Sequence, residues 1–175
     1  MSAPQPALSL SPEFAVGLRE YMLQGLSREL ETTKKVIAAI PEDKRDYRPD
    51  PKSRTAWELA WHLASCDVQM TDETADQKFN MEPRFKEEPK TVAELVDWYD
   101  SNLKRAIARV RELSAEQLCT PVDFIGAFNF PTVIYLGFVN NHSIHHRGQL
   151  AAYLRPMGSK VPSIYGGSAD EPWAG

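Results

Sequence analysis

Cysteines are few in this sequence, and long apolar runs are missing. Cys66 and Cys119 are too few for a disulfide framework, so we expect both thiols to be reduced. No apolar run approaches the roughly 18 residues that a membrane span needs. The first residues, MSAPQPALSLSPEF, lack the basic segment and apolar core of a signal peptide. These absences predict a cytoplasmic protein that makes no membrane contact.

Blocks of lysine and arginine are also missing. The chain of 175 residues has 20 Lys and Arg against 24 Asp and Glu, which gives a formal net charge of −4. Such a chain offers no basic surface to the phosphates of a nucleic acid, so we expect no nucleic-acid partner. The length suits one globular domain over residues 1–175, with enough residues to bury a core.

Apolar residues recur at three- and four-residue spacing in four segments, which predicts four amphipathic helices. We expect them over about residues 12–40, 55–77, 91–113 and 131–157. Thr55 with Glu58, and Thr91 with Glu94, have the spacing of capping boxes at two of the helix starts. Gly158 is placed to end the last helix.

The segments between these helices are polar or rich in proline and glycine. Residues 1–11 are expected to be frayed, and the tail over 159–175 to be irregular, with Tyr165 as a candidate to fold back beside the helices. The segment TPVDFIGAFNF is either a short hairpin or an ordered loop. Four helices without internal repeats predict an all-α protein with a four-helix bundle. The connection between the second and third helices is long enough for a parallel or an antiparallel pair.

Three of the four histidines lie close together in NNHSIHHRGQL, on the fourth predicted helix. At about 100° per residue, His142 and His146 lie about 40° apart within the apolar stripe of that helix. His145 lies toward the edge of the stripe. The remaining histidine, His62, occurs in ELAWHLASC on the second predicted helix and shares its face with Leu59.

Two inward-facing imidazoles at positions i and i+4 can chelate one metal ion. A third histidine from another helix would leave coordination positions open for water or substrate, as in catalytic metal sites. The alternative is that the histidines are polar core residues without a metal. A buried imidazole without a partner costs about 1–3 kcal/mol, and three of them without a shared partner would multiply that cost, but the spacing alone leaves both alternatives open.

Two neighbours of His62 are further candidates for this site. Cys66 lies one turn along the same face, either as a fourth ligand, as a wall residue or as a small buried apolar residue. Glu58, one turn earlier, could act as a base or orient a ligand, but its capping box already accounts for it. Arg147 lies about 140° from His142 on the helix, so we expect it at the surface or in an interface.

Several segments resemble the DinB/YfiT-like family. NHSIHHRGQL resembles the family signature, in which Asn-His is followed by variable positions and then by His-Arg-Gly-Gln. IPEDKRDYRPDPKSRTAWELAWHLA resembles the family's loop and second helix, including the segment with the first metal histidine. VPSIYGGSADEP resembles the tail of many members. The resemblance extends from the first predicted helix to residue 172.

The resemblance implies a bundle of up-down-down-up order that is usually a homodimer. It also implies a divalent metal, commonly nickel or zinc, held by His62, His142 and His146, whereas the position of His145 is variable. Some relatives are thiol S-transferases or thiol-dependent isomerases that use a low-molecular-weight thiol such as bacillithiol, mycothiol or glutathione.

These observations predict a metal-dependent enzyme with a small-molecule substrate, either a thiol S-transferase or a hydrolase. A divalent ion lowers the pKa of a thiol or of a water, which favours one reaction or the other. The sequence identifies no catalytic residue apart from the weak candidate Glu58. The alternative is a non-catalytic bundle that binds a metal or a small molecule.

Overall fold

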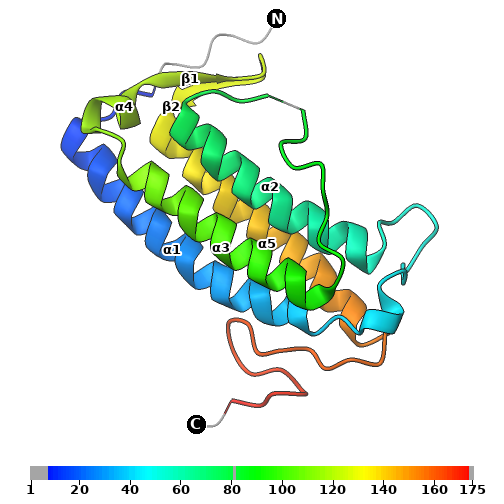
Figure 1. Cartoon of the computed structure of the whole chain (residues 1–175). Helices are drawn as coiled ribbons and strands as arrows, with labels where there is room; N and C mark the ends of the chain where they lie inside the picture. Colours follow the sequence, from blue (N-terminus) through cyan, green and yellow to red (C-terminus); the bar gives the residue numbers. More distant parts are fainter. Residues whose placement is uncertain (1–7, 81, 174–175) are drawn as a thin grey trace, which may run out of the picture.

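Four long helices form a bundle, as predicted (Figure 1). The structure is a computed structural model that describes residues 8–80 and 82–173. The long helices are α1 (Pro12–Ala38), α2 (Ala56–Asp76), α3 (Val92–Arg111) and α5 (Tyr135–Leu154). The connections contain the short helices η1 (Glu42–Lys44), α4 (Ala115–Cys119) and η2 (Thr132–Ile134), and the strands β1 (Pro121–Phe124) and β2 (Phe128–Pro131). Within the described residues, no helix combines the length and the apolarity that crossing a bilayer requires.

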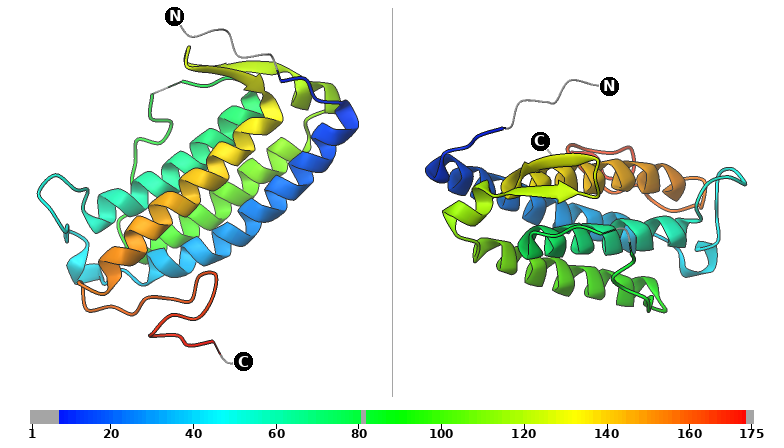
Figure 2. Two further views of the ribbon diagram at one scale, coloured as in Figure 1. Left: turned by 180° about the vertical axis from the view of Figure 1, so that it is seen from behind. Right: turned by 90° about the horizontal axis from the view of Figure 1, so that it is seen from above.

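The helices follow the up-down-down-up order that the family resemblance implies. α1 and α2 each pack against both α3 and α5. α1 and α5 run in one direction, and α2 and α3 run in the other (Figures 1 and 2). Hydrogen bonds also join the start of α3 and the end of α2 to the neighbouring connections, η1 and α4. At one end the backbone N–H of Val92 donates to Glu42, and at the other the Gln77 side chain donates to the carbonyl of Gln117. The connection over residues 77–91 therefore returns along the length of the bundle.

One of the two predicted capping boxes is complete. The Thr55 hydroxyl accepts a bond from the backbone N–H of Glu58 at 3.1 Å, and the Glu58 carboxylate accepts one from the N–H of Thr55 at 2.7 Å. Thr91 also caps its helix through the N–H of Glu94. However, the Glu94 carboxylate accepts from the N–H of Lys90, one residue too early, so the second box is only half formed.

The ends of the predicted helices needed correction. The third ends at Arg111 rather than near residue 113, and the chain then forms α4, which was not predicted. The fourth starts as the tighter turn η2 and becomes α-helical at Tyr135. It ends at Leu154, and Gly158, with φ 80°, permits the turn in which Ser159 donates to the Leu154 carbonyl.

The segment after α4 is a hairpin, which resolves the choice left open by the sequence. β1 and β2 pair antiparallel, with Val122 opposite Phe130. The hydroxyl of Tyr135 donates to the Val122 carbonyl at 2.6 Å, which fastens the hairpin to the start of α5. The hairpin thereby carries Phe124 to one end of the bundle, beside α2 and α5.

Arg147 is buried, and its expected position at the surface or in an interface is wrong. The residue is 1% exposed. Its guanidinium forms an ion pair with Glu29 of α1 and donates to the Tyr165 hydroxyl at 2.5 Å. The helix angle correctly directs Arg147 away from the histidines, but α5 packs against α1 as well as α2. The face opposite the histidines is therefore buried too.

The C-terminal tail folds back onto the bundle, as expected. The Tyr165 hydroxyl donates to Glu29 at 2.9 Å, so α1, α5 and the tail meet at one buried ion pair. Asp170 closes the tail on itself by accepting from the Val161 N–H and from Arg155. Of residues 1–11, expected to be frayed, residues 1–7 lie outside the described residues, and Leu8–Ser11 form no helix or strand.

Candidate metal centre

His62, His142 and His146 come together between α2 and α5, as the sequence predicts. One nitrogen from each ring lies within 4.8 Å of the other two, so the group could hold a metal ion. The Nε2 atoms of His62 and His146 are 3.2 Å apart. His145 is exposed and outside this group, although its ring lies 4.8 Å from that of His146. The structure thus places His142 and His146 within the group and His145 outside it.

The Nδ1 atom of each of the three rings has its own partner. His142 Nδ1 lies 2.7 Å from Asp67 Oδ1, and His146 Nδ1 lies 2.8 Å from Gln149 Oε1. Both partner oxygens accept hydrogen bonds, so each Nδ1 carries a proton, and in the neutral form of each ring Nε2 keeps its lone pair. The third ring, that of His62, places Nδ1 3.3 Å from the Cys66 sulfur. This pattern leaves the three Nε2 atoms for a metal, and partners of this kind usually orient metal-binding histidines.

Asp67 connects the candidate ligands to the core. Its side chain is fully buried, and its second oxygen accepts a 2.6 Å hydrogen bond from Tyr99 of α3. α3, α2 and α5 are therefore linked through one carboxylate to His142. The sequence did not lead us to predict a role for Asp67. A signal was present, because an acidic residue one turn after Leu63 on a core-facing stripe is expected to be buried and therefore to have a polar or charged partner.

The charges of the three histidines differ in the metal-free site. Burial lowers the pKa of His142, but the hydrogen bonds and negative charges of Asp67 and Cys66 together outweigh burial and raise that pKa to about 9. Burial, with the positive charge of Arg54, lowers the pKa of His62 to about 4. Burial also lowers the pKa of His146. At neutral pH, His62 and His146 are ready to coordinate, while His142 must release one proton.

A cavity of about 450 Å³ opens from the histidine group. His62 and His142 lie in its wall together with Cys66. Most of the remaining wall is apolar, from Trp61, Met70, Pro83, Phe85 and Phe124, and the polar residues Ser65, Gln69, Glu73 and Asn80 complete it. This arrangement suits a small molecule that places one reactive group at the histidines and buries an apolar body beyond them.

The two other candidates occupy different positions. Cys66 is half-buried and lines the cavity beside His62, as one of the predicted alternatives has it. Glu58 is outside the cavity lining. Its hydrogen bond from the Thr55 backbone lowers the pKa of its carboxyl. The observed role of Glu58 is therefore helix capping, and its geometry gives no support to a role as a base.

The fold and the histidine group together define a helical bundle with a possible metal site. Residues 26–150 match the DinB superfamily. This match covers more than half of the chain, so the protein belongs to the DinB superfamily.

Individual relatives agree with this assignment. The chain is 25% identical over 156 residues to the protein YrdA of Bacillus subtilis (strain 168), covering 89% of this chain and 92% of YrdA. It is 26% identical over 135 residues to YjoA of the same organism, covering 76% of this chain and 86% of YjoA. A crystal structure of a DinB-like protein from Bacillus cereus ATCC 10987 superposes with a TM-score of 0.71 at 26% identity, covering 83% of this chain and 97% of that one. That of YjoA superposes with a TM-score of 0.68 at 23% identity, covering 82% and 97%.

Proposed function

We propose that His62, His142 and His146 hold a divalent metal ion, nickel or zinc, and that the protein is a metal-dependent thiol S-transferase. The observation that carries this proposal is the approach of the three rings at the edge of a largely apolar cavity, each with its Nδ1 already engaged. Neutral imidazoles suit both metals. Three protein ligands leave coordination positions for a substrate.

The protein supplies orientation and a dry environment for this chemistry. When bound, the ion would lower the pKa of a thiol or of a water. In the transfer reaction, the thiol sulfur forms a bond to an electrophilic carbon and the thiol proton is released. The bond from that carbon to the displaced group breaks with its electron pair: a chloroarene loses chloride, and the ring oxygen of an epoxide stays attached and takes up a proton. Asp67 and Gln149 hold the rings of His142 and His146. The apolar walls favour a substrate with an apolar body over a wholly polar one.

Hydrolysis is the second candidate reaction, because the same ion would activate water. A non-catalytic bundle that binds a metal or a small molecule is the alternative to an enzyme. Among the described residues, the cavity lining contains no histidine beyond the proposed ligands, and its acidic residue is Glu73. The scarcity of groups that could act as a base supports this alternative. The predicted homodimer and cytoplasmic location, and the predicted lack of a nucleic-acid partner, stay predictions.

Metal analysis combined with a substrate screen tests the proposal. We expect about one nickel or zinc ion per chain after supplementation. The loaded protein should join glutathione, bacillithiol or mycothiol to a chloroarene or an epoxide, measured by mass spectrometry of the conjugate. Chelation should abolish the product and the added metal should restore it. A chain that stays metal-free after supplementation would contradict the proposal, and ester cleavage without conjugation would favour the hydrolase. A loaded protein without turnover would favour the binding module.

Replacing Asp67 by asparagine should weaken metal binding by about 10–100-fold. The amide keeps the size of the side chain and can still accept from His142 Nδ1, but it removes the negative charge beside the ring. The measurement is metal affinity by competition with a chromogenic chelator.

Asp76→Asn is the matched control for Asp67→Asn. It removes a carboxylate of the same helix that pairs with Arg84 and Arg109 outside the histidine group, so metal affinity should be unchanged. Equal affinities for Asp67→Asn and the unmodified protein, both folded by circular dichroism, would show that Asp67 does not support the ligand.

A further inference from the structure

The cavity beside the histidines has two chemically different ends on one helix. His62, Cys66, Gln69 and Glu73 all line it, and their spacing of four, three and four residues puts them on one face of α2. The eleven residues from His62 to Glu73 correspond to roughly 16 Å along the helix axis. A molecule that reaches both ends must therefore be elongated.

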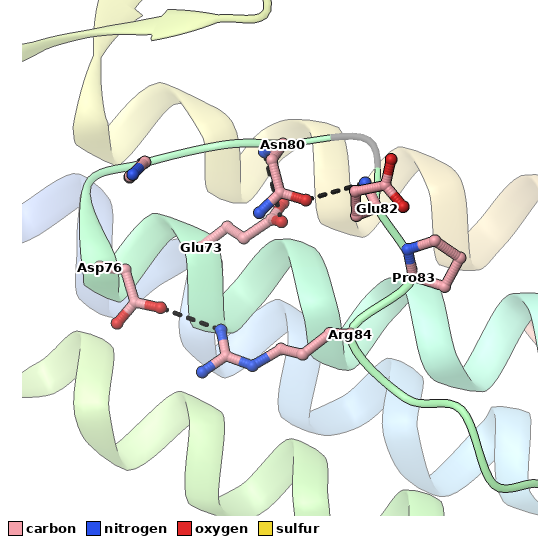
Figure 3. Close-up of a pocket in the computed structure, with 7 residues that line it drawn as sticks. Glu73, Asp76, Asn80, Glu82, Pro83 and Arg84 are labelled. Atoms are coloured by element: carbon pink, nitrogen blue, oxygen red, sulfur yellow. Dashed lines mark hydrogen bonds and ion pairs between the residues drawn. The ribbon is translucent and has the colours of Figure 1, made fainter.

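Glu73, at the far end, is a buried carboxylate without a cationic partner among the described residues. The residue is 5% exposed. Its Oε1 atom accepts from the Gln69 side chain at 3.0 Å and from the Asn80 backbone at 3.4 Å. Figure 3 shows a second cavity, which shares Glu73, Asn80 and Pro83 with the cavity at the histidines. In it the Glu73 side chain extends toward Asn80, whereas Arg84 reaches toward Asp76. Arg84 is thus engaged elsewhere, with its Nη1 2.9 Å from Asp76.

The other buried carboxylates of α2 each have a basic side chain as a partner, which Glu73 lacks. Asp67 pairs with His142, and Asp72 pairs with Arg105 and Arg109. A buried charge is costly unless an opposite charge or several hydrogen bonds compensate for it. Burial accordingly raises the pKa of Glu73, and its hydrogen bonds only partly oppose this. A cation entering the cavity would supply the missing compensation.

We propose that Glu73 binds a protonated amine at the far end of the substrate, and that the thiol substrate is an elongated molecule with an apolar middle and an ammonium group opposite its sulfur. This inference rests on the proposed function, because it takes the histidine end as the reacting end. Trp61, Met70 and Phe85 line the apolar part of the cavity. Glu73 would determine specificity without touching the reacting atoms.

Binding of simple thiols to the cobalt-loaded full-length protein tests this assignment. The probes are ω-aminoalkanethiols of increasing chain length and ω-hydroxyalkanethiols of matched length, titrated while the visible absorption of the metal is followed. At the best length, the amine should bind about 10–100-fold more tightly than the alcohol, as expected for a hydrogen bond between charged groups. Glu73→Gln should remove this preference and leave the affinity for the alcohol unchanged.

Glu82→Gln is the matched control. It removes an exposed carboxylate that lines the second cavity (Figure 3) but not the cavity at the histidines. The preference for the amine should survive in this variant. Its persistence in Glu73→Gln would show that another residue binds the amine.

The failures of the two proposals are distinguishable. Equal binding of amine and alcohol at every length would overturn the role of Glu73 while the thiol site stands. A metal spectrum that no thiol perturbs would overturn the thiol site, and the substrate assignment with it. Equal binding of amine and alcohol by the unmodified protein overturns the role of Glu73 even if Glu73→Gln does not fold.

Discussion

Replacing His142 by alanine should abolish stable metal binding. The variant keeps His62 and His146 but loses one of three ligands, and Asp67 loses the imidazole that it orients. Removing a residue that only orients a ligand, such as Asp67, weakens metal binding by up to roughly 100-fold. Removing the ligand His142 itself should weaken it by more than that. The measurement is metal content after gel filtration, together with the absorption spectrum of the cobalt- or nickel-loaded protein.

His145→Ala is the matched control for that experiment. This histidine is on the same helix within three residues of His142, yet it is exposed and outside the group. It should leave both the metal content and the spectrum unchanged. Full metal content in His142→Ala would show that the three-histidine group is not the binding site.

Replacing Glu29 by leucine should destabilise the protein by about 3–5 kcal/mol, because it leaves the Arg147 charge buried without its partner. The side chains are 14% exposed for Glu29 and 1% for Arg147, so water cannot replace the lost interaction. The Tyr165 hydroxyl also loses its acceptor, which should loosen the tail. The measurement is the free energy of unfolding from urea titration followed by circular dichroism.

Two further variants make this result specific. Glu31 is two residues after Glu29 on the same helix, and its exposed carboxylate pairs with Lys34. Glu31→Leu should change the free energy of unfolding by less than about 1 kcal/mol. The double variant Glu29→Leu with Arg147→Met should recover most of the stability, since an apolar pair can replace a buried ion pair. A Glu29→Leu protein as stable as Glu31→Leu would show that the ion pair is not a main source of stability.

The sequence predicted the four long helices and the histidine pair because both depend on periodicity within one segment. His142 and His146 are one turn apart on a core-facing stripe, whatever that stripe packs against. The inclusion of His62 rested on the core-type pattern of its helix and on the family resemblance. α4 escaped prediction because five residues are too few to show a helical period.

Partners across the bundle could not be predicted in the same way. A helix angle says which residues share a face, but it does not say which neighbour that face meets. Arg147 and Asp67 illustrate the limit. The first finds its partner on α1, 118 positions away in the chain, and the second is 75 positions from His142. Only the helix order, with α5 between α1 and α2, brings these pairs together.

The parallel arrangement of α2 and α3 places a long return segment beside the cavity, and this segment forms part of the cavity wall without contributing a candidate metal ligand. The histidines and Asp67 lie on the helices, so the packing of the bundle fixes them. The return segment over residues 77–91 supplies Asn80, Pro83 and Phe85 to the cavity wall but none of the three histidines. Changes in this segment can reshape the cavity and leave the metal ligands in place. Under the proposed function, changes in this segment would alter substrate preference at little cost to folding or to the three histidines.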